Sequence, residues 1–396
     1  MRVRNPFSVL VLSAGVAAAP APTPGQSVAP TGWELKGIPA LNFNSDEGFG
    51  YGVVLQAYHY GATGASPYRF TLQPTLFLTT RGRRDVSLFF DAPHLLRAGW
   101  RVGAFLASEQ QLATPYYGIG NSTPHEAAKE QAPNPYYYRF GRRGIRVTAD
   151  VQRSLGRSAR VLVGVGARTW RIDPTPFDSG TTLLAQTVGA AGVPDGRITY
   201  ARAGLVWDTR DREVGPRHGT WVEALAQRGV MALGATHAFT RLTFTARGYV
   251  SPGARTTLAS RLIVQNVDGD VPFYLLFAVQ GSFKDDEGLG GAGTLRGLPK
   301  NRFAGKGLAA WNSEVRVRTA DFTLRGQASS LVLSAFLDAG RVWPDRLRLA
   351  ELGQGLHLGY GGGARLVLGT NFVIALDVGR SSESAAQLYL GLGYLF

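Results

Sequence analysis

Cysteine is absent from the 396-residue chain, and no segment after residue 19 contains 18 uninterrupted apolar residues. Without cysteine, the fold can use neither disulfide bonds nor thiolate metal sites. Without a long apolar run, the chain after residue 19 offers no candidate transmembrane helix, which needs about 20 mostly apolar residues. The structure must therefore be held together by packing, hydrogen bonds and ion pairs.

Lysine is scarce as well. Only five of the 42 basic residues are lysine, and 28 acidic residues leave a net charge of +14. Arginine pairs with carboxylates and phosphates through a planar fork, so this composition suits internal ion-pair networks and lipid phosphate. A basic chain can also bind nucleic acid, but its bases are spread singly, with no dense cluster beyond RGRR at 81–84. We therefore expect no nucleic-acid partner.

The N-terminal segment has the pattern of a secretory signal. Arg2 and Arg4 precede the apolar run FSVLVLSAGVAAA at 7–19, which is too short to span a membrane and ends in small residues. We assign 1–21 to a signal peptide, 22–32 to a proline-rich tether and 33–396 to one folded domain. Two classes of exported protein fit these features, a soluble secreted β protein and an outer-membrane β-barrel.

From residue 33 onward, apolar and polar residues alternate. In FTRLTFTARGYV at 239–250, Leu242 and Phe244 fall on one face, whereas Arg241 and Thr243 fall on the other. A period of two predicts a strand. Sixteen segments show this pattern, near 35–44, 48–60, 68–79, 84–93, 99–110, 136–151, 159–172, 197–209, 219–230, 237–250, 255–268, 307–319, 329–343, 355–369, 371–380 and 386–396.

The connections between these segments separate the two classes. The long connections, at 111–135, 173–196 and 269–306, follow the fifth, seventh and eleventh segments. If the N-terminus is periplasmic, odd-numbered connections face outward, and long outer loops with short periplasmic turns are typical of bacterial outer-membrane barrels. We therefore predict an all-β fold, a sixteen-stranded antiparallel transmembrane β-barrel in the bacterial outer membrane.

In such a barrel the polar face lines the lumen and the apolar face meets lipid. Charged residues would be costly on the lipid face, and the alternation places the following residues on the polar face: Arg101, Arg146, Arg168, Arg202, Arg247, Arg261, Glu314, Arg316, Asp338, Arg365 and Asp377.

The last predicted strand, QLYLGLGYLF, alternates and ends on phenylalanine. Such a strand resembles the signal by which outer-membrane barrels are recognised for insertion, although an ordinary lipid-facing strand would have the same pattern. The alternation places these residues together on its apolar face: Leu388, Leu390, Leu392, Tyr394 and Phe396.

Residues that could carry catalysis are few. The six histidines include no pair at metal-ligand spacing, and no G-x-S-x-G motif occurs. The glycine-rich GYGGGAR at 359–365 lies within a strand pattern, and glycines at lumen positions 359, 361 and 363 predict room for a bulky group inside the barrel. We expect no enzymatic activity, cofactor or metal; a barrel hydrolase with a Ser-His site is the alternative left open.

One loop motif carries a family resemblance. GTLRGLPKNRF at 293–303 is similar to the V-R-G-F/Y loop motif of the BamA/TamA outer-membrane assembly superfamily, also called the bacterial surface antigen family. Arg296 and Gly297 match the motif, whereas Leu295 and Leu298 replace the usual valine and aromatic residue.

Three further stretches support this resemblance. GLAAWNSEVRVR at 307–318 resembles the strand that follows the loop in the family, and FLDAGRVW at 336–343 resembles its F-x-D-x-G-x-V-W strand. The motifs occur in the family's order, and sixteen is the family's strand number. WDTRDREVGPRHG at 207–219 resembles the family's periplasmic turn, through Asp208, Arg210, Asp211, Pro216 and Gly219.

The resemblance implies that the long loop folds into the lumen as a latch. In the family the loop arginine meets carboxylates on the inner wall, and here Glu314 and Asp338 are the candidates because both fall on lumen faces. A guanidinium folded into a barrel needs such partners, and paired carboxylates orient it as well as attract it. Gly297 would allow a tight backbone turn beside Arg296.

One feature departs from the family. Relatives that assemble or secrete proteins carry periplasmic POTRA modules before the barrel, whereas here only the tether separates the signal from the first strand. The expected site is then the seam between the first and last strands, which would open sideways or thin the nearby bilayer; alternatively, its residues only permit curvature. Proline removes a ladder donor and glycine weakens pairing, and the seam residues are Gly37, Pro39, Gly391, Gly393 and Phe396.

Two functions follow from the resemblance. The first is assistance in the insertion or transport of outer-membrane proteins or lipids, and the alternative is a passive channel or structural barrel plugged by its own loop. The expected partners are outer-membrane lipid and lipopolysaccharide, with outer-membrane proteins or lipids as substrates. We expect a monomer.

Overall fold

The computed structural model describes residues 31–396, except 45–46, 63–67, 94–95, 97–98, 132, 179, 190–194, 325–326 and 369–371. The predicted signal peptide and all but the last two residues of the predicted tether lie outside this part of the chain. Over the described residues, no helix is both long enough and apolar enough to cross a membrane.

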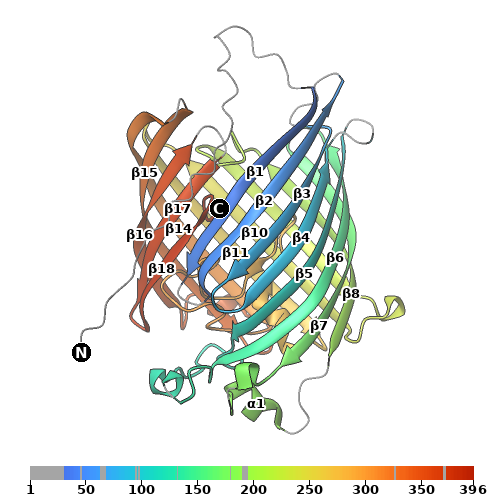
Figure 1. Cartoon of the computed structure of the whole chain (residues 1–396), viewed down its shortest axis with the longest axis vertical. Coiled ribbons are helices and arrows are strands. Elements are labelled where there is room, and N and C mark those ends of the chain that lie inside the picture. The colour runs from blue at the N-terminus through green and yellow to red at the C-terminus, as the bar shows by residue number, and fades with distance from the viewer. Residues whose placement is uncertain are drawn as a thin grey trace, which may run out of the picture.

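The chain forms a closed barrel of sixteen antiparallel strands (Figure 1). Strands that are neighbours in the barrel wall are also consecutive in the chain, apart from the meeting of the first and last strands. The strands are β1 (Gly32–Asn44), β2 (Gly48–Gly61), β3 (Phe70–Thr79), β4 (Arg83–Ala92), β5 (Trp100–Pro115), β6 (Arg139–Leu155), β7 (Ala159–Asp173), β8 (Gly196–Asp208), β9 (Gly219–Gly229), β10 (Phe239–Val250), β11 (Thr256–Gly269), β14 (Gly307–Leu324), β15 (Gln327–Trp343), β16 (His357–Leu368), β17 (Phe372–Ser381) and β18 (Ser384–Leu392).

Each of the sixteen predicted segments is a strand, so the predicted fold class is confirmed. The boundaries differ most at β5, which continues to Pro115, and at β14, which continues to Leu324, whereas β18 ends at Leu392, before the predicted end at Phe396. The alternation also holds in three dimensions. Along β9, Glu223 and Leu225 are buried toward the interior, whereas Ala224 is exposed on the outer wall.

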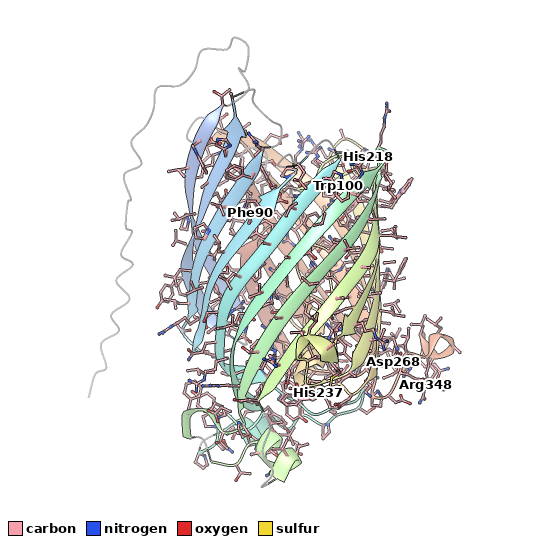
Figure 2. All side chains as sticks on the ribbon, turned by 90° about the vertical axis from the view of Figure 1, so that its right-hand side faces the viewer. Phe90, Trp100, His218, His237, Asp268 and Arg348 are labelled. Carbon is pink, nitrogen blue, oxygen red and sulfur yellow. The ribbon has the colours of Figure 1, made fainter. Side chains whose placement is uncertain are left out.

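The two ends of the barrel differ as the lengths of the connections predicted. The short turns marked by Trp100 and His218 lie at one end, and His237, Asp268 and Arg348 lie at the other (Figure 2). The second end carries the long loops with their small elements: η1 (Ala127–Glu130), η2 (Pro176–Asp178), α1 (Leu183–Val188), η4 (Met231–Leu233), η5 (Phe273–Phe277), β12 (Ala278–Val279), β13 (Asp286–Glu287) and η6 (Leu349–Glu351).

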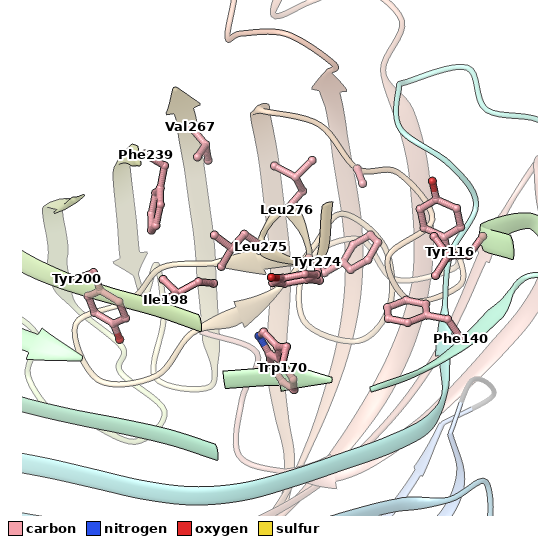
Figure 3. Packing of buried hydrophobic residues seen from close by; sticks show 13 residues of the cluster. Tyr116, Phe140, Trp170, Ile198, Tyr200, Phe239, Val267, Tyr274, Leu275 and Leu276 are labelled. Carbon is pink, nitrogen blue, oxygen red and sulfur yellow. The ribbon is translucent and has the colours of Figure 1, made fainter. Parts of the chain in front are cut away.

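An apolar cluster joins the loops to the strand ends near this second end (Figure 3). Leu184 of α1 and Tyr274 of η5 pack with Phe140 of β6 and Trp170 of β7. The cluster is built from several separate loops, so the loop end of the barrel is a packed layer rather than a set of independent loops.

The loop that joins β11 to β14, residues 270–306, enters the barrel. Its residues Leu289, Leu295 and Leu298 are fully buried and pack against the inner wall, where Ile263 and Val342 belong to the same apolar cluster. The lumen is therefore filled by a second, internal core, and this core positions the Arg-Gly motif of the loop.

Candidate functional site

Arg296 lies inside the barrel with 1% of its surface exposed. Its Nε and Nη2 donate to the two oxygens of Asp338 at 2.8 and 2.9 Å, and its backbone N–H donates to the same carboxylate at 3.0 Å. Its Nη1 donates to Glu314 Oε1 at 2.6 Å. The guanidinium carbon also lies 3.6 Å from the ring centre of Phe336. The contacts with Glu314 and Asp338 that the sequence predicted are therefore present.

The register of the wall strands explains this geometry. Glu314 on β14 and Asp338 on β15 lie on neighbouring strands, where Asn312 is the direct partner of Asp338 and Glu314 is two residues further along. Residues two apart on one strand share a face. The two carboxylates therefore point into the lumen side by side and can hold one guanidinium between them.

The latch is part of a larger ion network that the sequence analysis did not assemble. Glu314 also accepts from Arg316 Nε at 2.7 Å, and Asp377 on β17 binds Arg365 at 2.7 Å and lies 3.5 Å from Arg296. Three arginines face three carboxylates, so docking the loop buries no net charge. Alternation placed Arg316, Arg365 and Asp377 on the lumen face, but nothing in the sequence linked them to Arg296.

Glycines let the loop approach the wall closely. Gly297 has φ +94°, a conformation that residues with a side chain rarely adopt. A Cβ on Gly359 of β16 would lie 1.8 Å from the carbonyl oxygen of Arg296, and one on Gly379 of β17 would lie 2.7 Å from the backbone nitrogen of Gly297. The predicted bulky group opposite Gly359 is thus the latch loop itself.

The other two glycines of the GYGGGAR stretch allow close packing between strands of the barrel wall. A Cβ on Gly361 would lie 2.0 Å from the Val378 carbonyl oxygen, and one on Gly363 would lie 1.9 Å from Asp377. These positions accommodate the neighbouring strand β17 and its side chain, not the loop. The expectation of lumenal space therefore holds at one of the three glycines.

The predicted periplasmic turn motif forms a compact turn between β8 and β9. Arg210 binds Asp208 through Nε at 2.9 Å and Nη2 at 3.1 Å, and its guanidinium carbon lies 4.4 Å from the ring centre of Trp221. Asp211 accepts from the backbone N–H groups of Arg217 and His218.

Two further residues of this motif shape the same turn. Gly219 has φ +96°, and a Cβ there would lie 2.2 Å from the Thr209 carbonyl oxygen. Pro216 is buried within the turn. Together with the ion pair of Asp208 and Arg210, these features give the motif a structural role in the turn between β8 and β9.

The seam between β1 and β18 is short. Among the described residues the two strands pair only at Phe43–Leu390 and Asn44–Tyr389. By contrast, the opposite edge of β18 pairs with β17 from Ile374–Leu392 to Ser381–Ser384.

The predicted seam glycines and proline do not lie in this pairing. Gly37 and Pro39 face only β2, where they pair with Leu55 and Val53, and Gly391 pairs with Ala375 of β17. They flank a seam in which two residue pairs join β1 and β18 over the described part of the chain.

The end of the last strand corrects an expectation. Phe396 does not lie on the lipid face: Gly393, with φ +84°, turns the chain inward, and Phe396 packs in the interior against Tyr249 and Ala259 with 6% of its surface exposed. Its backbone oxygen accepts from Arg316 Nη2 at 3.1 Å. Alternation alone continues through Gly393, so the sequence pattern could not reveal this turn.

No group of three or more His, Asp or Glu residues in the described part of the chain is arranged to hold a metal ion. The contacts that the described residues show at this site are ion pairs, hydrogen bonds and strand pairing. One loop is held by an ion network on the β14–β17 wall, and one strand pair is joined over a short length.

Comparison with known proteins identifies the family to which this barrel is related. A family model described as the Omp85 superfamily domain matches residues 72–385. No curated protein matches the chain.

Solved structures share the fold at low sequence identity. BamA from Haemophilus ducreyi, in a crystal structure lacking POTRA domains 1–3, has a TM-score of 0.60 and 11% identity over 92% of this chain. CdiB from Escherichia coli has a TM-score of 0.58 and 12% identity over 91% of the chain, and CdiB from Acinetobacter baumannii has 0.50 and 11% over 91%. The chain spans 71%, 63% and 60% of the lengths of those three proteins, respectively.

Proposed function

The chain belongs to the Omp85 superfamily as an outer-membrane β-barrel, and we propose that it assists the insertion or transport of outer-membrane proteins or lipids by opening sideways between β1 and β18. We further propose that it resides in the bacterial outer membrane as a monomer surrounded by phospholipid and lipopolysaccharide.

The observation that carries this proposal is the short pairing of β1 with β18. Among the described residues, Phe43 and Asn44 are the ones of β1 that pair with β18, so residues 32–42 present an edge for which the described part of the chain supplies no strand partner on that side. An unpaired backbone group costs several kcal/mol in hydrocarbon, and a free edge is a template for adding another strand. The edge of β1 is therefore a suitable place to receive an incoming strand.

The filled lumen supports a sideways route over an axial one. The latch loop occupies the interior with its own apolar core, and Arg296 is held by two carboxylates in the wall. A substrate moving along the barrel axis would have to displace this core. Among the described residues, a substrate entering at the seam would meet two residue pairs of backbone pairing between β1 and β18.

A disulfide across the seam tests the proposal. The chain has no cysteine, so Phe43→Cys combined with Leu390→Cys gives one defined pair at directly opposed positions. The protein in liposomes is assayed for insertion of an unfolded outer-membrane barrel and for transfer of fluorescent phospholipid between leaflets. We expect oxidation to abolish the activity and reduction to restore it.

The matched control is a disulfide at a fully paired position. Ala226→Cys with Leu242→Cys joins β9 and β10 at opposed residues on the outer wall, so it stiffens the barrel without closing the seam. Equal activity in the oxidised and reduced seam variants would reject a sideways opening.

The alternative is a passive barrel plugged by its own loop, and the filled lumen favours it. In that case the seam never opens, and neither insertion nor lipid transfer exceeds that of empty liposomes, whether or not the seam is oxidised. The same pair of disulfide variants therefore separates the two functions.

A further inference from the structure

Four consecutive residues of the latch loop reach both sides of the seam from inside the barrel. We propose that Gly297–Lys300 acts as an internal clamp that holds β1 to β18, and that the ion pair between Lys300 and Glu47 is its releasable end. The clamp rests on the proposed function, because it regulates the opening of that same seam.

On one side the clamp holds β18 through Tyr389. The Tyr389 hydroxyl accepts from the Gly297 backbone N–H at 3.1 Å and donates to the Leu298 carbonyl oxygen at 3.3 Å. Tyr389 is also one of the two β18 residues that pair with β1, where its partner is Asn44. The loop therefore binds β18 at the same residue that closes the seam.

On the other side the clamp holds the turn between β1 and β2. Lys300 Nζ lies 2.5 Å from Glu47 Oε1 and 2.6 Å from Glu287 Oε1, and both Lys300 and Glu47 are buried. Glu47 follows Asn44 by three residues, so this ion pair holds the chain close to the described pairing of β1 with β18. The other oxygen of Glu47 accepts from Arg83 of β4 at 2.8 Å, which ties the turn to the wall.

The segment between these two attachments is constrained by burial, a backbone hydrogen bond and restricted backbone angles. Leu298 is fully buried, and its carbonyl oxygen also accepts from the Gly291 backbone N–H at 3.0 Å. Pro299 has a fixed φ angle, and Gly297 holds a left-handed turn. A movement of Lys300 is therefore passed to Tyr389, and the two sides of the seam are connected through four residues.

The two attachments can break without unlatching the loop. Arg296 stays bound to Glu314 and Asp338, which lie on β14 and β15 and not at the seam. If Lys300 moves away, Glu47 keeps Arg83 as its partner, so no isolated buried carboxylate remains. The loop is thus anchored to β14 and β15 through Arg296, and it is attached more weakly to the two sides of the seam through Lys300 and Tyr389.

Distance measurements across the seam test the clamp. In the cysteine-free chain, Leu41→Cys on β1 and Leu388→Cys on β18 place spin labels on exposed outer-wall positions. Pulsed electron spin resonance in lipid bilayers then reports the separation. Lys300→Met and Tyr389→Phe should each raise the fraction of long distances roughly fivefold, the effect of losing about one hydrogen bond, and the double variant should raise it further.

Two controls keep the test specific. Lys306→Met removes a lysine of the same loop whose Nζ donates to the Gly269 carbonyl oxygen, away from the seam, and it should leave the distances unchanged. Lys300→Arg keeps the charge and should stay close to the wild-type distribution. Heat-modifiable migration in gels confirms that each variant is a folded barrel.

The outcomes separate the clamp from the proposed function. Unchanged distances in folded Lys300→Met and Tyr389→Phe would overturn the clamp, even if the seam disulfide abolishes insertion. Longer distances in these variants, together with no insertion or lipid transfer by any form of the protein, would support the clamp and reject the proposed function.

Discussion

The wall formed by β14 to β17 and the seam between β18 and β1 receive the same loop in different ways. On the wall, the guanidinium of Arg296 binds two carboxylates, those of Asp338 and Glu314. Glycines in the wall strands let the backbone of the loop lie directly against the backbone of the wall. At the seam, the loop backbone binds the Tyr389 hydroxyl of β18 through two hydrogen bonds, and the loop presents one lysine to Glu47 beside β2.

This difference suits the two roles that we propose for the loop, a fixed anchor on the wall and a releasable contact at the seam. Arginine binds two carboxylates in a fixed planar geometry, whereas lysine is a point charge on a flexible stem. The wall side resembles a core, in which charges balance and strands pair over long stretches. Among the described residues the seam side is joined by fewer bonds than the wall, which is why we propose the seam as the place that opens.

Breaking the wall anchor should have the largest effect. Arg296→Met leaves the buried Glu314 and Asp338 without their shared partner, which typically costs about 3–5 kcal/mol. We expect this loss in the free energy of unfolding measured with urea in lipid vesicles, together with faster proteolysis of residues 285–303. Arg348→Met removes an exposed pair with Asp345 and should change stability by less than about 1 kcal/mol. Equal effects of the two variants would contradict the anchor.

Adding a side-chain atom where the wall and the loop touch should reduce stability by a smaller amount. Gly359→Ala places a Cβ 1.8 Å from the Arg296 carbonyl oxygen, so the loop must shift, at a cost of about 1–3 kcal/mol. Gly248→Ala on β10 is the matched control, because its Cβ would meet nothing within 4 Å. Urea unfolding of the two variants gives the comparison, and a control as damaging as Gly359→Ala would show that strand glycines matter for another reason.

A mild pH change should have no effect on the seam. Burial alone would raise the pKa of Glu47, but the neighbouring Lys300 ammonium and Arg83 guanidinium hold it well below its usual range. A carboxylate with a lowered folded-state pKa contributes stability above its unfolded pKa, about 4.3, and loses it only as the pH falls toward the folded value. Spin-label distances between positions 41 and 388 should therefore be the same at pH 7 and pH 5, and a longer distance at pH 5 would contradict this protonation state.

The sequence predicted the wall better than the seam for a physical reason. A period of two defines each strand and its lumen face. The family resemblance of the Arg-Gly motif implied carboxylate partners for Arg296, and alternation placed the candidates Glu314 and Asp338 on lumen faces. The pairing of Lys300 with Glu47 joins residues 253 positions apart. No local pattern records such a contact, and it depends on where the barrel closes.

The tail shows a second limit of the pattern. Leu388, Leu390 and Leu392 alternate as predicted, but Gly393 turns the chain and Phe396 enters the lumen. Glycine in a strand and glycine in a turn look the same in sequence. Only the interior partners Tyr249 and Arg316 distinguish the two, and these lie on strands far away in the chain.

The attachments of the loop also imply an order of assembly. The carboxylate partners of Arg296 lie 18, 42 and 81 residues further along the chain, whereas the partner of Lys300 lies near the start of the barrel. During synthesis the loop emerges after β1 and β2 and before the strands that receive it. Contacts between distant residues form late because closing long loops costs entropy. If the loop binds the later strands first, Lys300 is then positioned to bind Glu47 next to β2. This contact would bring the first strand next to the last strand as the barrel closes.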